Sequence, residues 1–136
     1  MLARRQFHAA HEARAAARPD RRMKTFAQTL DMVDDPRLIA EYEDWHRRVL
    51  PEVVRGLRAI GIRRMRIYRH GARLFMCYEA PDGFDPARDY ASYAREPRVQ
   101  EWERLMRRFQ RPVPGAEPGS WWAPMREVFD LERSPP

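Results

Sequence analysis

The chain has 136 residues, which fits one domain, and 43% of them are hydrophobic, enough for a packed core, so it is not a disordered chain. No apolar run approaches the roughly 18 residues of a membrane-spanning helix, and no signal-peptide core is visible, so we expect no membrane partner. The net charge of +6 includes +4 in residues 1–22, and the remaining Arg residues are interleaved with Glu and Asp, which argues against nucleic-acid binding.

The single cysteine, Cys77, rules out a disulfide within the chain and suits a reducing compartment, so we expect a cytoplasmic protein. Residues 1–22 are rich in Ala and Arg and lack apolar periodicity, which predicts a disordered N-terminal extension. A targeting peptide or a tail that binds an acidic partner remains open for this segment. Residues 23–136 contain no repeat or linker, which predicts one α+β domain.

The first half of this domain is predicted to be a strand followed by a helix. Residues 24–32 alternate enough for a first strand. A helix is predicted over residues 36–60, because Asp35 can cap it and Pro36 suits its first turn. Gly61 is placed to end this helix.

The second half is predicted to contain three strands and one helix. Residues 62–69 and 72–80 have strand patterns and are joined by the tight turn "HG". A helix over residues 86–110, broken near Pro97, precedes a Pro- and Gly-rich loop and a last strand over 123–131. The order βαββαβ predicts a ferredoxin-like α+β sandwich.

The predicted strand over residues 72–80 is apolar on both faces. Its side chains alternate between one face with Leu74, Met76 and Tyr78 and another with Phe75 and Cys77. A strand of this kind is covered on both faces, yet two helices cover only one side of a four-stranded sheet. We therefore expect a homodimer in which a second subunit covers the other side.

His46 lies in the middle of the apolar arc of the predicted first helix. At about 100° per residue, Ile39, Val53 and Leu57 fall about 20° from it and Tyr42 about 40°. A lone inward histidine is more often a core residue, hydrogen-bonded here to Tyr42 or to a backbone carbonyl, than an acid–base group. Periodicity alone leaves both interpretations open.

The residues facing His46 suggest a pocket. Met65 and Ile67 lie on the same, apolar face of their predicted strand. Trp102 lies on the inner face of the second predicted helix, with Glu103 at the margin of that face. Tyr42, His46, Met65 and Trp102 would then wall a pocket on the sheet. No metal-ligand spacing, Gly-rich phosphate loop or nucleophile with a partner base is evident, so no metal site is predicted.

Four segments of the sequence resemble the L-rhamnose mutarotase family in order and spacing. They are "YEDWHRRVLPEV", "IYRHGARLFM", "PRVQEWERLMRRF" and "WAPMREVFDL". The resemblance runs from Met23 to about Leu131 and implies a cofactor-free dimer, a dimeric α+β barrel of ferredoxin-like fold. Its members interconvert the anomers of 6-deoxy sugars, so a monosaccharide is the implied substrate.

The resemblance also implies roles for single residues. His46 matches the family's proton donor, Tyr42 a sugar-binding tyrosine, and Trp102 the first residue of a paired-tryptophan binding site. Met65 stands where a second binding tyrosine is expected and Glu103 where the second tryptophan is expected. These departures resemble a sub-branch associated with L-fucose, which favours L-fucose over L-rhamnose.

The implied chemistry is acid–base opening and reclosure of the pyranose ring. His46 would supply the proton, and Glu103 is the hypothesised sugar-binding group or complementary base. A second functional class remains open from the residues, because cofactor-independent monooxygenases and non-catalytic small-molecule binders use similar dimeric α+β barrels. The Tyr42, His46 and Trp102 constellation is the feature that these alternatives do not need.

Overall fold

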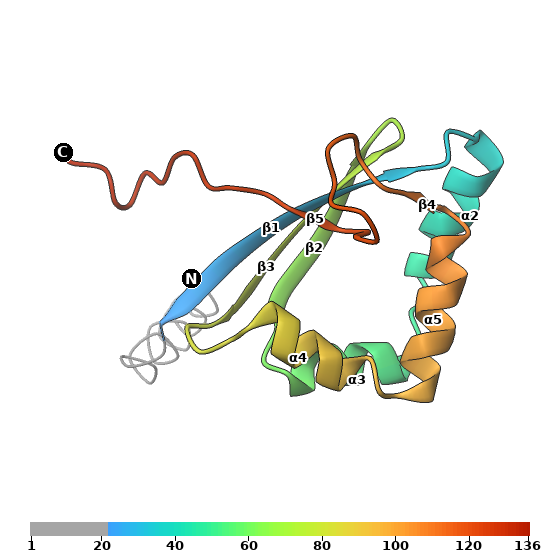
Figure 1. Ribbon diagram of the computed structural model, residues 1–136, viewed down its shortest axis with the longest axis horizontal. Helices are drawn as coiled ribbons and strands as arrows, with labels where there is room; N and C mark the ends of the chain where they lie inside the picture. Colours follow the sequence, from blue (N-terminus) through green and yellow to red (C-terminus); the bar gives the residue numbers. More distant parts are fainter. Residues whose placement is uncertain (1–21) are drawn as a thin grey trace, which may run out of the picture.

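The computed structural model describes residues 22–136, and the predicted extension over residues 1–22 lies outside this range apart from Arg22. The elements in chain order are β1 (Met23–Met32), α2 (Pro36–His46), α3 (Pro51–Ala59), β2 (Arg63–His70), β3 (Arg73–Pro81), α4 (Pro86–Tyr93), α5 (Pro97–Arg107), β4 (Gln110–Arg111) and β5 (Ala123–Pro124). The helices gather on one side of the sheet (Figure 1). Within the described residues, no helix has the length and apolar character needed to cross a membrane.

The sheet is antiparallel and confirms the predicted ferredoxin-like sandwich. Its strands follow the order β2-β3-β1-β4, and β5 also pairs with β1. The first strand and the third long strand are therefore central, with Phe26 opposite Tyr78 and Leu30 opposite Leu74. One irregularity interrupts the β2 ladder between Arg63 and Arg66, where Arg64 has a φ of 51°.

The single helix predicted over residues 36–60 is wrong, because the structure has two helices there. Asp35 caps α2 as expected, its Oδ1 accepting from the backbone N–H of Arg37 at 2.8 Å. The helix ends at His46, and Pro51 begins α3 instead of lying inside a longer helix. Proline lacks the N–H and crowds the carbonyl four residues earlier, so it is tolerated in a first turn but not in an interior.

The second predicted helix is broken near Pro97 as expected, into α4 and α5, and α5 ends at Arg107 instead of residue 110. The last predicted strand, over residues 123–131, is mostly wrong. Only Ala123 and Pro124 pair with β1, followed by one bond from the Met125 N–H to the Ala27 carbonyl at 2.8 Å. Proline cannot donate to a ladder, and the chain then leaves the sheet.

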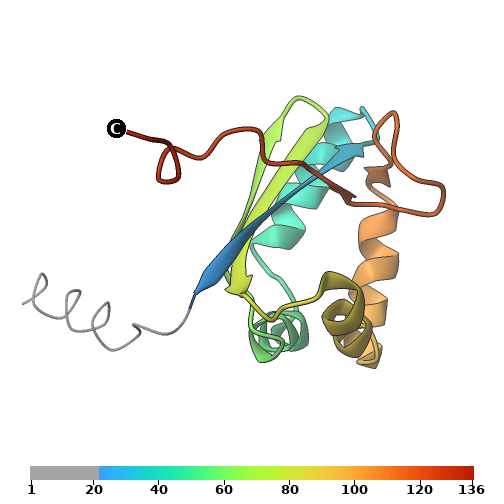
Figure 2. The same cartoon turned by 60° about the vertical axis from the view of Figure 1, so that its left-hand side comes forward.

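This departing segment, residues 126–136, is called the C-terminal arm below. It leads away from the sheet and helices as an extended chain (Figure 2). Three large apolar side chains on it are exposed to solvent, Val128, Phe129 and Leu131.

The core between sheet and helices forms two clusters. The first cluster lies under α2, α3 and α5 and is composed of Leu30, Met32, Tyr42, Val53, Leu74, Tyr93, Val99, Trp102, Met106 and Phe109. The second cluster lies along β3 and is composed of Ile62, Met76, Tyr78, Ala80 and Phe84. The predicted alternation of β3 is confirmed, since Leu74, Met76 and Tyr78 are buried while Phe75 is 37% exposed.

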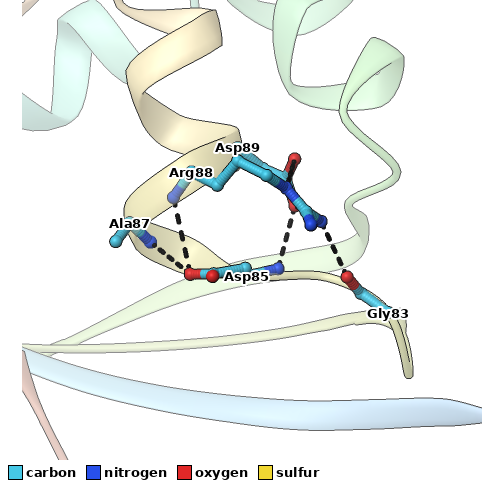
Figure 3. A network of polar contacts seen from close by, with 5 residues as sticks. All are labelled: Gly83, Asp85, Ala87, Arg88 and Asp89. Atoms are coloured by element: carbon cyan, nitrogen blue, oxygen red, sulfur yellow. Dashed lines mark hydrogen bonds and ion pairs between the residues drawn. The ribbon is translucent and has the colours of Figure 1, made fainter.

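A network of polar contacts fixes the start of α4 (Figure 3). The Asp85 carboxylate accepts from the backbone N–H groups of Ala87 at 3.0 Å and Arg88 at 3.4 Å, which caps the helix. In return the Asp85 N–H donates to Asp89 Oδ2 at 2.9 Å, and the Arg88 guanidinium donates to the Gly83 carbonyl at 2.8 Å. The loop before α4 and its first turn are thereby held together.

Candidate active site

The helix α2 places Tyr42 and His46 one turn apart on its inner face. Tyr42 is only 3% exposed, and its ring centroid lies 4.2 Å from that of His46 at an interplanar angle of 41°. His46 is half-buried and is the last residue of α2. Asp44 between them is exposed and forms ion pairs with Arg47 and Arg48.

One hydrogen bond defines the chemical state of His46. Its Nδ1 lies 2.8 Å from the backbone oxygen of Tyr42. A carbonyl oxygen only accepts, so Nδ1 must carry a proton, and in the neutral imidazole Nε2 is then unprotonated. Burial lowers the pKa of His46, and the hydrogen bond to Tyr42 opposes this shift. Nε2 is thus the nitrogen at which His46 gains or loses its titrating proton.

Aromatic rings from two helices enclose this imidazole. Trp102 on α5 is 6% exposed, and its ring lies edge-on to His46 with centroids 5.5 Å apart at 72°. Trp45, which precedes His46, lies edge-on to Trp102 at 6.4 Å, and the Arg48 guanidinium covers its ring at 4.6 Å. The imidazole therefore lies against apolar ring surface, which is the physical cause of its lowered pKa.

Glu103 follows Trp102 on α5 and is half-buried. Burial raises the pKa of its carboxyl, and the positive charge of Arg107 opposes this. The charge of Glu103 in turn contributes to the raised pKa values of Tyr42, Tyr90 and Tyr93, after the larger effect of burial. Glu103 is therefore near Tyr42 and near the tyrosines of α4.

The structure brings Tyr42, His46 and Trp102 into one cluster with Glu103 near Tyr42. Met65 is placed differently, because it packs against the second cluster. In the range 22–136, no group of three or more His, Cys, Asp or Glu residues is arranged to hold a metal ion.

Sequence reasoning missed several residues close to the site. Tyr90, on the second predicted helix, and Trp122, before the last predicted strand, were given no role, yet both pack against both clusters. Trp121 packs against the first cluster, and the Gln110 side chain acts on the Tyr42 hydroxyl, lowering its pKa against the effect of burial. Two adjacent tryptophans after a Gly- and Pro-rich loop were the available signal, because large aromatic residues rarely stay in solvent.

Comparison with known proteins identifies the family. A profile described as L-rhamnose mutarotase matches residues 25–131. The chain belongs to the L-rhamnose mutarotase family.

Two relatives of this mutarotase family member are similar over most of their length. A UPF0734 protein of Dictyostelium discoideum is 44% identical over 113 residues, covering 80% of this chain and 90% of that protein. The L-fucose mutarotase of Xanthomonas campestris pv. campestris is 43% identical over 114 residues, covering 82% and 91%. The crystal structure of an L-rhamnose mutarotase from Formosa agariphila matches the fold with a TM-score of 0.58 at 19% identity, covering 79% of this chain and 98% of that one.

Family membership decides between the two functional classes that the residues left open. The chain is an isomerase that acts on carbohydrates, of the sugar mutarotase type. A monooxygenase or a binder without catalysis no longer has support.

Proposed function

We propose that this mutarotase interconverts the α and β pyranose anomers of a 6-deoxy-hexose, with L-fucose preferred and L-rhamnose next. The observation that carries the proposal is the hydrogen bond from His46 Nδ1 to the Tyr42 carbonyl, which leaves Nε2 as the titrating nitrogen. The preference for L-fucose is supported by the 43% identity to the protein named L-fucose mutarotase.

The proposed mechanism is a pair of proton transfers without redox chemistry or a leaving group. The imidazolium of His46 donates its Nε2 proton to the ring oxygen as the bond from that oxygen to the anomeric carbon breaks. The Glu103 carboxylate accepts the proton of the anomeric hydroxyl, which gives the open-chain aldehyde. Reclosure on the other face of the carbonyl reverses both transfers, and each positioned acid–base group contributes about 10²–10⁴-fold.

The other residues of the first cluster bind the sugar in this proposal. The buried hydroxyl of Tyr42, near Gln110, is available to a sugar hydroxyl. The Trp102 ring offers an apolar surface for the C–H groups of the pyranose. Both side chains lie beside His46, so the anomeric carbon would be held against Nε2.

The test of this proposal is the rate of exchange between anomeric protons, measured by magnetisation-transfer NMR on L-fucose and L-rhamnose. We expect the wild-type protein to accelerate exchange and His46→Gln to lose at least 100-fold of that acceleration. His70→Gln is the matched control, because His70 is exposed at the end of β2. Absence of acceleration for both sugars would overturn the proposed function.

The role of Glu103 has its own test. Glu103→Gln keeps the size of the side chain and removes its basicity, so we expect the exchange rate to fall by about 10²-fold or more. Glu101→Gln is the control on the same helix, since Glu101 is exposed and pairs with Arg98 at 2.5 Å. An unchanged rate in Glu103→Gln would remove Glu103 as the base and leave the role of His46 untouched.

We also propose that the protein is a homodimer that associates through the outer face of its sheet. Tyr68 and Phe75 stack there with ring centroids 6.3 Å apart, and both are exposed. Met125, whose backbone N–H donates to the Ala27 carbonyl of β1, is exposed as well. The C-terminal arm carries three further exposed apolar side chains, Val128, Phe129 and Leu131. A second copy would cover the exposed rings of the outer face, since exposed apolar surface rimmed by polar residues marks interfaces.

Sedimentation equilibrium tests the dimer. Phe75→Glu would place a charge in the interface, and we expect it to convert a dimer into a monomer. Ala91→Glu is the control, because Ala91 is exposed on α4, away from the outer face. A wild-type protein of monomer mass would contradict the proposal.

A further inference from the structure

The imidazole of the candidate active site lies at the very end of a helix. His46 is the last residue of α2, and the backbone N–H of Arg47 after it donates to the Asp44 carbonyl at 3.1 Å. The last turn of a helix leaves carbonyl groups without helical partners, and helix ends fray. A side chain whose position decides a proton transfer therefore needs contacts beyond the helix itself to hold it there.

Arg48, two residues after His46, folds back onto this last turn. Its backbone N–H donates to the Trp45 carbonyl at 3.0 Å. Its guanidinium donates to Asp44 Oδ2 at 2.7 Å, and the guanidinium carbon lies 4.6 Å from the centre of the Trp45 ring. A guanidinium over a tryptophan face attracts it within about 6 Å. Arg48 is itself exposed, so it covers the Trp45 ring from the solvent side and holds it in place.

The Trp45 ring is in turn a support for Trp102 on α5. The two helices lie beside each other (Figure 1), and the two indole rings meet edge-on with centroids 6.4 Å apart at 84°. The Trp102 ring meets the His46 imidazole edge-on as well, at 5.5 Å. Within residues 22–136 these are the aromatic pairs of Trp102, and both partners come from α2. Edge-to-face pairs are attractive and prefer one geometry, so they fix the tilt of the Trp102 ring relative to the imidazole.

We propose that Trp45 is a positioning residue of this site, which holds the Trp102 ring against His46 and is itself held by Arg48 and Asp44. This inference rests on the proposed function, in which Trp102 is the apolar surface for the sugar and His46 is the acid. Trp45 acts through Trp102 and does not contact the sugar. A fixed Trp102 ring keeps the pyranose beside Nε2 and keeps water away from the imidazole.

The first experiment compares wild type with Trp45→Leu and Trp45→Phe. It measures kcat and KM for anomer exchange, and the pKa of His46 by NMR titration of its Cε1 proton, whose signal is identified by its loss in His46→Gln. We expect Trp45→Leu to lower kcat/KM about 2- to 10-fold, the worth of one aromatic pair. The pKa of His46 should rise back toward 6.5, because water reaches the imidazole. Trp45→Phe keeps a ring for both neighbours, so it should restore most of both values.

The second experiment uses two neighbouring arginines as a matched pair, Arg48→Met and Arg47→Met. Both arginines are exposed and form ion pairs with Asp44, Arg47 at 3.6 Å. Each substitution removes one positive charge from the end of α2, so the electrostatic effects on His46 are closely matched. Of the two, Arg48 is the one that covers Trp45. We expect Arg48→Met to lower kcat/KM about 2- to 5-fold relative to Arg47→Met, the worth of one cation–π contact, and to raise the pKa of His46 further.

Thermal unfolding separates a positioning role from a structural one. A lowered Tm of Trp45→Leu with a wild-type pKa of His46 and a wild-type kcat/KM would show that Trp45 serves the core alone, and it would overturn the inference. Equal effects of the two arginine substitutions would also overturn it, and these exposed sites decide the matter if Trp45→Leu does not fold. If the wild-type protein accelerates exchange of neither sugar, the proposed function fails, while the pKa of His46 still shows whether Trp45 holds Trp102 in place.

Discussion

The pH dependence of anomer exchange follows from the shifted pKa values of His46 and Glu103, which burial changes in opposite directions. Burial lowers the pKa of His46 from about 6.5, and burial raises the pKa of Glu103 from about 4.5. Opening of the ring needs the imidazolium as acid and the carboxylate as base. The population with both in these states is greatest between the two pKa values, so we expect a bell-shaped rate profile that falls in acid and in alkali.

The alkaline side of this profile gives a magnitude. Because the pKa of His46 lies below 6.5, at pH 7.5 at most about one molecule in eleven carries the imidazolium. Each further pH unit then lowers the enzymatic exchange rate about tenfold. On the acid side, protonation of Glu103 removes the base, and the rate falls again.

Magnetisation-transfer NMR from pH 4.0 to 8.5 provides the assay. The spontaneous exchange rate at each pH is measured in a sample that contains His46→Gln and is subtracted from the rate with the wild-type protein. In Glu103→Gln the acid limb should disappear while the alkaline limb remains. A rate that rises from pH 6 to 8 would refute the reasoning, because it would make the neutral His46 a base instead of an acid.

Three further predictions concern the elements that hold the site, and each is checked by thermal or urea unfolding. Gly56→Ala should destabilise the protein by about 1 kcal/mol net, because the new Cβ would lie 2.8 Å from Cδ2 of the buried Tyr93 ring. Overpacking costs about 1–3 kcal/mol, which outweighs the gain of up to about 1 kcal/mol in helix propensity. A stabilised variant would show that the Tyr93 ring moves aside without cost. Asp35→Ala should cost about 1 kcal/mol by removing the cap of α2, and the exposed neighbour Asp34, changed in the same way, should cost much less. Phe109→Ala should cost about 3–5 kcal/mol, because the side chain is fully buried against Tyr42, and a loss under 1 kcal/mol would contradict the packing described for the first cluster.

Hydrophobic periodicity was enough to predict the fold and the position of His46. The alternation along β3 separated its side chains into two faces without showing which one meets the helices, and the arc around His46 placed this residue inside before any contact was known. The break before Pro51 was not predictable from the same pattern, because Val53 and Leu57 fall where the apolar face of α2 would lie if that helix continued. A proline in that pattern fits a kinked helix and a new first turn equally well.

The remaining differences have the same origin, since a one-dimensional pattern does not specify partners. Residues 126–131 have strand-like side chains, but a strand needs a neighbouring ladder, and residues 22–136 supply none there. Similarly, the sequence shows that Tyr78 and Tyr90 are tyrosines but not that their rings meet edge to face in the core.

The irregularity in β2 has a consequence for how copies of this chain avoid uncontrolled assembly. Among the described strands β2 lies at the edge and pairs with β3 alone, so within this part of the chain its other side presents backbone groups to which a further strand could add. Four arginines, the bulge and the positive φ of Arg64 all fall on this strand. Like charges and a twisted ladder oppose edge-to-edge growth into fibres. Any productive association of two copies is thereby directed away from the edge and toward the broad face of the sheet.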